Sequence, residues 1–220
     1  MPATLEPGGD SRIAAGTVPG HAVPHGREQA ALAASHARLV DAIAGLTDED
    51  ARRDSRLPGW TVGHVLTHVA RNADSLVRRM AGAARGEVVD QYAGGPDGRA
   101  AEIEAGAARP AAELVADVRD TAAAAERACA ELPAEAWDRL GRSTGGAPQT
   151  MRRVLTGRIR EVEMHHVDLG LGYEPADWPE AFARAELDAG LWHMVEHADP
   201  RALLGWLSGR GPAPELPPWP

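Results

Sequence analysis

Apolar residues recur every three or four positions along most of the chain between residues 27 and 169, which is the repeat of an amphipathic helix. Aromatic residues make up only 4% of the sequence, so a core must be built mainly from alanine, leucine and valine. Alanine and leucine are strong helix formers, whereas strands favour β-branched and aromatic residues. The sequence therefore predicts a mainly α-helical fold.

Turn-forming residues divide this pattern into long segments, with Pro110 interrupting the third of them. The expected helices are residues 27–46, 62–80, 99–132 and 150–169. Four long amphipathic helices are typical of a four-helix bundle. We expect the bundle to occupy residues 27–172. A disordered leader at residues 1–26 should precede it, and a short C-terminal cap, rich in proline and tryptophan, should follow at residues 173–220.

Charge and composition exclude several classes of function. The formal net charge is −9, and a surface that acidic repels the phosphates of nucleic acids. All 23 basic residues are arginines, which excludes mechanisms through a lysine amine. No apolar run approaches the roughly 18 residues of a membrane span, and we find no signal peptide, so we expect a cytoplasmic protein. Cys129 is the one cysteine and falls on an apolar helical face, so we expect an unreactive core residue.

Two pairs of potential metal ligands stand four residues apart within the predicted helices. His64 and His68 form one pair, and Glu161 and His165 form the other. Residues four apart project to the same side of a helix, and bundle metal sites are built from such side chains on facing helices. One histidine of the first pair and both residues of the second would make a His2Glu set with an open coordination position. Spacing alone leaves an ordinary surface or core role open, because such pairs are common on charged helices.

Several separated blocks of sequence resemble one known family. They occur in order at residues 57–68 (LPGWTVGHVLTH), 92–99 (YAGGPDGR), 160–170 (REVEMHHVDLG), 204–211 (LGWLSGRG) and 217–219 (PPW). These blocks resemble the signatures of the mycothiol-dependent maleylpyruvate isomerase family, one of the DinB-like metal-binding four-helix bundles. The resemblance extends from about Arg27 to the C-terminus, although residues 173–220 are shorter than the α/β segment that usually ends these proteins.

The resemblance implies which residues would form the site. The metal ligands would be His68, Glu161 and His165, and the arginines that bind the substrate would be Arg99 and Arg210. A His2Glu set suits zinc, and nickel, cobalt or iron would bind to it too.

Two further residues are expected to support the ligands without touching the metal. Neither His64 nor Asp168 is a ligand in the family's pattern, so we expect both of them in a second shell. Asp168 shares the helix face of the Glu161 and His165 pair, which suits a residue that orients a ligand. The alternative for Asp168 is an ordinary aspartate at the end of a helix.

The activity that the resemblance implies is isomerisation of maleylpyruvate, a dicarboxylate, to fumarylpyruvate with mycothiol as the thiol cofactor. Addition of a thiolate to the cis double bond, rotation about the resulting single bond and loss of the thiol would leave the trans isomer. Two alternatives remain open: a mycothiol S-transferase that acts on electrophiles, and a non-catalytic metal-binding bundle. Thiol-dependent turnover separates the two enzymes from the binding protein. Comparison of maleylpyruvate with a neutral electrophile separates the enzymes from each other.

Overall fold

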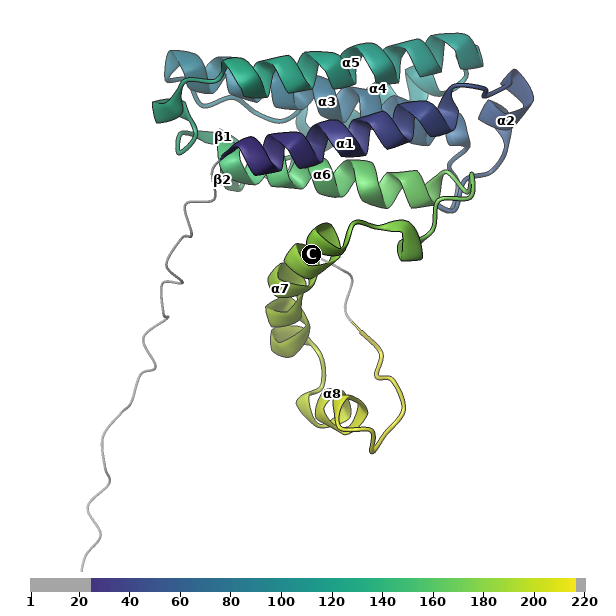
Figure 1. Cartoon of the computed structure of the whole chain (residues 1–220), viewed down its shortest axis with the longest axis vertical. Helices are drawn as coiled ribbons and strands as arrows, with labels where there is room; N and C mark the ends of the chain where they lie inside the picture. Colours follow the sequence, from purple (N-terminus) through teal and green to yellow (C-terminus); the bar gives the residue numbers. More distant parts are fainter. Residues whose placement is uncertain (1–24, 217–220) are drawn as a thin grey trace, which may run out of the picture.

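A computed structural model describes residues 25–216 of the chain. Its main body is a bundle of four long helices: α1 (His25–Ile43), α3 (Val62–Arg85), α5 (Ala111–Glu131) and α6 (Met151–Asp168) (Figure 1). Helix α3 packs against α5 and α6, and α1 closes the bundle by packing against the same two helices. The mainly helical bundle predicted from the sequence is therefore confirmed.

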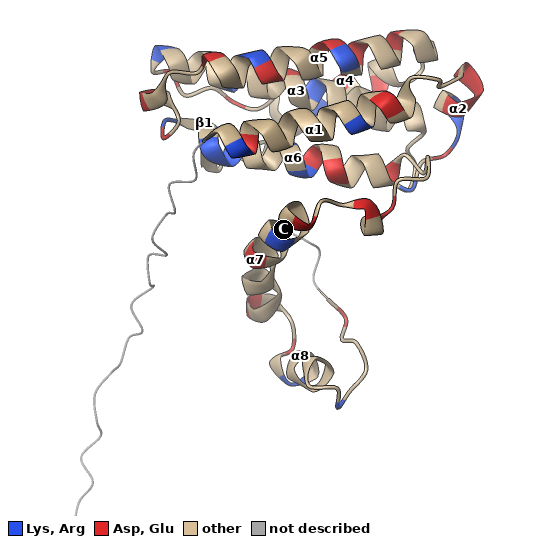
Figure 2. Cartoon of the chain, in the orientation of Figure 1, with Lys and Arg blue, Asp and Glu red and all other residues tan. Residues whose placement is uncertain are grey.

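Aliphatic side chains from the four helices fill the interior of the bundle. One buried cluster includes Leu76 and Leu155, and a second includes Leu66 and Leu114. Acidic and basic residues are interspersed along the helices, with no continuous basic stripe in the view of Figure 2. None of the helices in the described part of the chain combines the length and the apolar character needed to cross a membrane.

The start of α3 is fixed by a reciprocal cap. The backbone N–H of His64 donates to the hydroxyl of Thr61, and the backbone N–H of Thr61 donates to the ring Nδ1 of His64 at 3.2 Å. Gly63 lies in the first turn, where an added Cβ would stand 2.2 Å from the carbonyl oxygen of Ala107. Glycine at this position therefore allows α4 (Gly95–Ala107) to lie close along α3. Together the cap and this close approach set the point at which His68, one turn further along, faces α6.

Helix boundaries differ from the sequence prediction in several places. The interruption predicted at Pro110 is present, since Pro110 separates α4 from α5. Helix α2 (Asp48–Arg52) is an additional short helix that the sequence did not predict. Helix α4 begins four residues before the predicted start at residue 99, because Gly94 and Gly95 turn the chain with φ angles of 76° and 64°. Helix α1 begins two residues before the predicted start, and residues 1–24 of the predicted leader lie outside the described residues.

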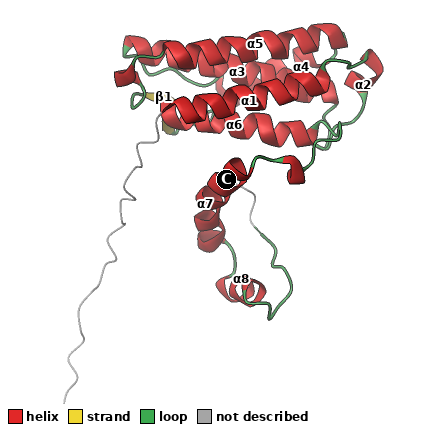
Figure 3. Ribbon diagram, in the orientation of Figure 1, coloured by secondary structure: helices red, strands yellow, loops and turns green. Residues whose placement is uncertain are grey.

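The sequence also failed to predict the structure around and after the last bundle helix. The strands β1 (Leu140–Arg142) and β2 (Pro148–Thr150) pair antiparallel just before α6. Three residues a strand are too few for an alternating pattern to be recognised. The predicted C-terminal cap contains two helices, α7 (Glu180–His197) and α8 (Pro200–Leu207), which project away from the bundle (Figures 1 and 3). The short 3-10 turns η1 (Ala134–Ala136) and η2 (Pro175–Asp177) lie in the connections.

Candidate metal centre

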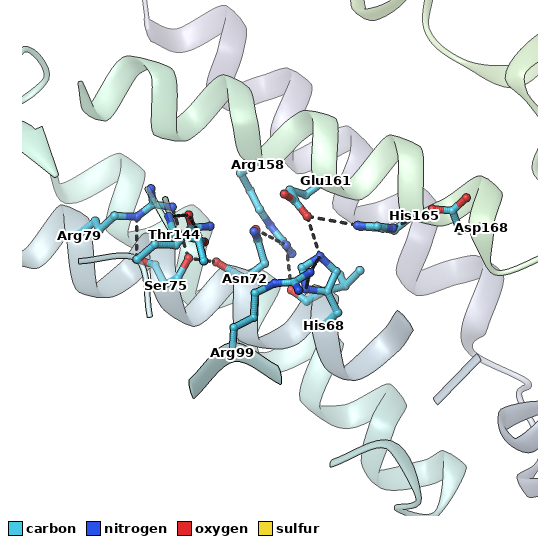
Figure 4. A network of polar contacts seen from close by, with 12 residues as sticks. His68, Asn72, Ser75, Arg79, Arg99, Thr144, Arg158, Glu161, His165 and Asp168 are labelled. Atoms are coloured by element: carbon cyan, nitrogen blue, oxygen red, sulfur yellow. Dashed lines mark hydrogen bonds and ion pairs between the residues drawn. The ribbon is translucent and has the colours of Figure 1, made fainter. Parts of the chain in front are cut away.

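Three side chains from two facing helices converge in the bundle. Nε2 of His68, on α3, lies 2.8 Å from Oε2 of Glu161, on α6. Nε2 of His165, one turn further along α6, lies 3.3 Å from the same carboxylate oxygen. The potential ligand atoms of the three residues all lie within 4.8 Å of one another. Figure 4 shows both imidazoles directed at the Glu161 carboxylate.

Both histidines are held by partners on their other ring nitrogen. Nδ1 of His165 hydrogen-bonds to Oδ2 of Asp168 at 2.8 Å, three residues along α6. A carboxylate partner keeps the proton on Nδ1 and leaves Nε2 as the nitrogen that faces the cluster. Nη2 of Arg99, from α4, lies 3.3 Å from Nδ1 of His68. The structure therefore brings Asp168 and Arg99 to the cluster, each beside a different histidine.

The charges within the cluster follow from burial and mutual hydrogen bonding. Burial alone would raise the pKa of Glu161, but hydrogen bonds with His165 and His68 outweigh it and hold this pKa well below its usual range. Burial opposes protonation of His165, yet hydrogen bonds with Asp168 and Glu161 raise its pKa to about 9. Burial is the largest influence on His68 and lowers its pKa. Near neutral pH the cluster thus pairs the Glu161 anion with the His165 cation, beside a neutral His68.

The arrangement fits a divalent metal ion. Two imidazole nitrogens and one carboxylate oxygen are the donor set of many catalytic zinc sites, and three protein ligands leave a fourth position open. Binding of an ion would displace the proton that His165 carries, so metal binding should release a proton and weaken as the pH falls.

A cavity of about 350 Å³ opens beside the cluster. Its lining residues are His68, Gln91, Tyr92, Pro96, Arg99, Thr144 and Glu161. The guanidinium of Arg99 lies over the ring of Trp60, 5.8 Å from its centroid, and Trp60 also contacts His68 edge-on at 5.7 Å. A small molecule in this cavity would therefore contact both the cluster and one fixed cation.

Two predicted site residues lie elsewhere. The imidazole of His64 caps α3, and its Nε2 lies 3.3 Å from the Glu104 carboxylate on α4. Arg210 is exposed beyond α8, where its Nη1 donates to the carbonyl oxygen of Ser208 at 2.9 Å. The structure does not bring either residue into contact with the ligand cluster.

Sequence reasoning missed two arginines that lie behind the cluster. Arg79 and Arg158 are only 5% and 2% exposed, and they line a second, smaller cavity that Glu161 also lines. The helical repeat contained a signal for one of them, because Arg158 lies one turn after the buried Val154 and one turn before the buried Val162. The sequence alone does not show whether an arginine on an apolar face is solvated or enclosed.

The bundle and its cluster define the class of this chain, which is a helical bundle with a candidate metal site between facing helices. A family model described as the mycothiol maleylpyruvate isomerase N-terminal domain matches residues 32–170, more than half of the chain. The chain therefore belongs to this family, as the sequence blocks had indicated.

Solved structures agree with this membership. A crystal structure of the mycothiol-dependent maleylpyruvate isomerase is similar to this chain, with a TM-score of 0.71 and 27% sequence identity. The match covers 76% of this chain and 69% of that chain. A crystal structure of a histidine-to-alanine mutant of the mycothiol-dependent maleylpyruvate isomerase gives the same TM-score and coverage at 26% identity. A search of curated proteins gave no significant match.

Proposed function

We propose that this protein is a metal- and mycothiol-dependent enzyme that isomerises maleylpyruvate to fumarylpyruvate. The observation that carries the proposal is the convergence of His68, Glu161 and His165 within 4.8 Å, in a chain that belongs to the mycothiol maleylpyruvate isomerase family. These three residues would hold the ion, and zinc suits the donor set best. The bound ion would supply a Lewis acid that lowers the pKa of a thiol at the open position.

Arg99 is the residue we assign to the substrate. In a neutral histidine that binds an ion through Nε2, the proton sits on Nδ1. Nδ1 of His68 then cannot accept a hydrogen bond from the nearby Nη2 of Arg99. The guanidinium donors of Arg99 would be free for another acceptor in the same cavity, and a substrate carboxylate is the acceptor that suits them best.

The chain supplies no competing nucleophile of its own in the described core. Cys129 is 1% exposed, and burial is the main cause that raises its pKa to about 12. A thiol in that state is protonated near neutral pH and out of reach of a substrate. Isomerisation by reversible addition to the double bond would therefore depend on a thiol from solution, which is consistent with mycothiol as the cofactor.

The test is a direct assay of purified protein with maleylpyruvate, with and without mycothiol, comparing wild type with Arg99→Gln and Arg85→Gln. Arg85 is an exposed residue at the end of α3 that pairs with Glu87, so its replacement matches the change of charge away from the site. We expect thiol-dependent formation of fumarylpyruvate, and a fall in kcat/KM of about tenfold or more for Arg99→Gln. Wild-type turnover without added thiol, or equal kcat/KM in the three proteins, would contradict the proposal.

One observation favours a second candidate, a mycothiol S-transferase that acts on electrophiles. A dicarboxylate substrate calls for a cation at each end, yet Arg210 is exposed and bonded to its own neighbour Ser208. A site with fewer cations would accept a neutral electrophile. Conjugation of mycothiol to a neutral electrophile at a kcat/KM above that for maleylpyruvate would select this function instead.

A further inference from the structure

A second cavity adjoins the candidate metal centre on the inner side of Glu161. It has a volume of about 130 Å³, and Glu161 and Gln91 line both this cavity and the larger one. Four arginines line it: Arg79 from α3, and Arg153, Arg158 and Arg160 from α6. We call this cavity, with these four residues, the arginine pocket. Arg160 is paired with Glu186 on α7, and Glu161 is the one carboxylate in the lining, so the other three arginines give the pocket an excess of positive charge next to the ligand cluster.

Arg158 is almost completely buried and has only neutral hydrogen-bond partners. Its Nη1 donates to the carbonyl oxygen of Val69 at 2.8 Å and to Oδ1 of Asn72 at 3.0 Å, and its Nε donates to Nε2 of His36 at 3.2 Å. Its Nη2 has no hydrogen-bond partner among the described residues, although it is buried. Figure 4 shows this side chain reaching from α6 toward Asn72, next to Glu161.

Arg79 repeats this pattern from the opposite helix. Its Nη1 donates to Oε1 of Gln149 at 3.0 Å, and its other donors lie 3.3 Å from the backbone and hydroxyl oxygens of Ser75. Burial lowers the pKa of Arg79, and that of Arg158, to about 10, so both remain cations at neutral pH. No ion pair joins either guanidinium to a carboxylate within the described part of the chain.

Buried cations without a counter-charge are costly, and proteins normally pair them or place them where an anion binds. Glu161 is a nearby negative charge for both arginines but makes no hydrogen bond or ion pair with either, because its carboxylate faces the two histidines and would bind the metal ion. Arg153 adds an exposed guanidinium without a partner in the described structure, at the mouth of the pocket. The pocket therefore has a buried charged floor and an accessible rim, which suits a small anionic group that enters from solvent.

We propose that the arginine pocket binds a carboxylate group of the substrate and holds the molecule against the metal centre. The proposal rests on the proposed function for the identity of the substrate. A carboxylate can accept paired hydrogen bonds from guanidinium groups, and the pocket has room for such a group with one or two carbons. Arg99 lines the adjoining cavity, so a dicarboxylate would find a cation in each cavity, and Glu161 lines both of them. This supplies the second cation that Arg210 does not provide.

The test measures binding of maleate, a cis-dicarboxylate, to the metal-loaded protein by isothermal titration calorimetry. The variants are Arg79→Gln in the floor and Arg153→Gln at the rim, with Arg85→Gln as a control on α3 that changes the net charge equally. Circular dichroism and metal content are recorded for each protein. Arg79→Gln should raise the dissociation constant about 10- to 100-fold. Arg153→Gln should raise it about two- to fivefold, since its charge is solvated.

The proposal is overturned if wild type shows no binding of maleate, or if all variants bind it as wild type does. If Arg79→Gln loses its fold or its metal, Arg153→Gln against Arg85→Gln decides alone, because Arg153 is exposed and its guanidinium has no hydrogen-bond or ion-pair partner among the described residues. Arginine-dependent binding of maleate in a protein without thiol-dependent isomerase turnover would sustain the pocket and refute the proposed function. Isomerase turnover by the wild type, with unaltered maleate binding in Arg79→Gln, would sustain the proposed function and refute the arginine pocket.

Discussion

Replacement of Asp168 by asparagine should weaken metal binding although no ligand is removed. Oδ2 of Asp168 accepts a hydrogen bond from Nδ1 of His165 at 2.8 Å, and the two side chains are 22% and 17% exposed. This contact fixes the orientation of the imidazole and makes it a better donor to an ion. Its loss therefore acts on the metal through His165 alone.

The size of the effect follows from what each substitution leaves behind. Loss of such a supporting partner typically costs 10- to 100-fold in metal affinity, or about 1.4 to 2.8 kcal/mol. The amide of Asp168→Asn can still accept the hydrogen bond but carries no charge, so we expect the lower limit, about tenfold. Asp168→Ala removes the acceptor, and the imidazole can rotate, so we expect the upper limit, about 100-fold.

The assay is a competitive titration of zinc between the protein and a chelating dye, at one pH for all variants. Asp41→Asn is the matched control, because Asp41 is exposed on α1 and far along the chain from the cluster. Thermal unfolding of the metal-free proteins checks that Asp168→Asn has not simply loosened the end of α6. Equal zinc dissociation constants for wild type, Asp168→Asn and Asp168→Ala would refute the supporting role of Asp168.

Three further outcomes can be measured on the same protein. His68→Ala should abolish binding of the metal, whereas His64→Ala should retain it and lose only about 1 kcal/mol of stability from the α3 cap. Elemental analysis measures the metal content of both variants, and the reverse result would show that the ligand assignment is wrong. Cys129→Ala should leave turnover at saturating thiol unchanged, because Cys129 is buried, and loss of turnover in a folded variant would make it the nucleophile. Burial and the charge of Arg158 lower the pKa of His36 to about 2, against about 6.5 in the unfolded chain, so only the unfolded state gains this proton as the pH falls below 6.5. The unfolding free energy should drop by about 1.4 kcal/mol per pH unit on this account, and His36→Gln should remove that part of the slope between pH 6.5 and 5; an unaltered slope would contradict it.

The sequence was sufficient to predict the bundle and to predict that the two pairs of potential ligands lie on facing helices. Helical periodicity is set by local spacing, so α3 and α6 were predicted to within a few residues at most ends. The hairpin before α6 was missed because three-residue strands carry no period. Helices α7 and α8 were missed because the proline- and tryptophan-rich composition of residues 173–220 indicated a cap rather than regular helices.

The parts of the site that could not be predicted depend on tertiary packing. Nothing in the spacing of Arg79 distinguishes it from the solvated arginines of the same helix, and the spacing of Arg158 places it on an apolar face without showing how its charge is accommodated. Their burial appears only when α3 and α6 face each other and enclose a cavity. Arg99 was expected at the site from the family resemblance, and it lies beside His68 because two positive-φ glycines turn the chain into α4. Arg210 was predicted at the site because its sequence block resembles the family, but its side chain is exposed beyond α8.

Under the proposed function, thiol-dependent isomerisation requires an ion bound by His68, Glu161 and His165. The decisive measurement is a titration of the metal-free protein with zinc at saturating mycothiol and maleylpyruvate, while the formation of fumarylpyruvate is followed. We predict that the rate is negligible without zinc, rises in proportion to the zinc added, and levels off at about one equivalent per chain. In His68→Ala the rate should stay at the background value throughout. A rate that is independent of zinc, or a titration that His68→Ala does not alter, would contradict the account.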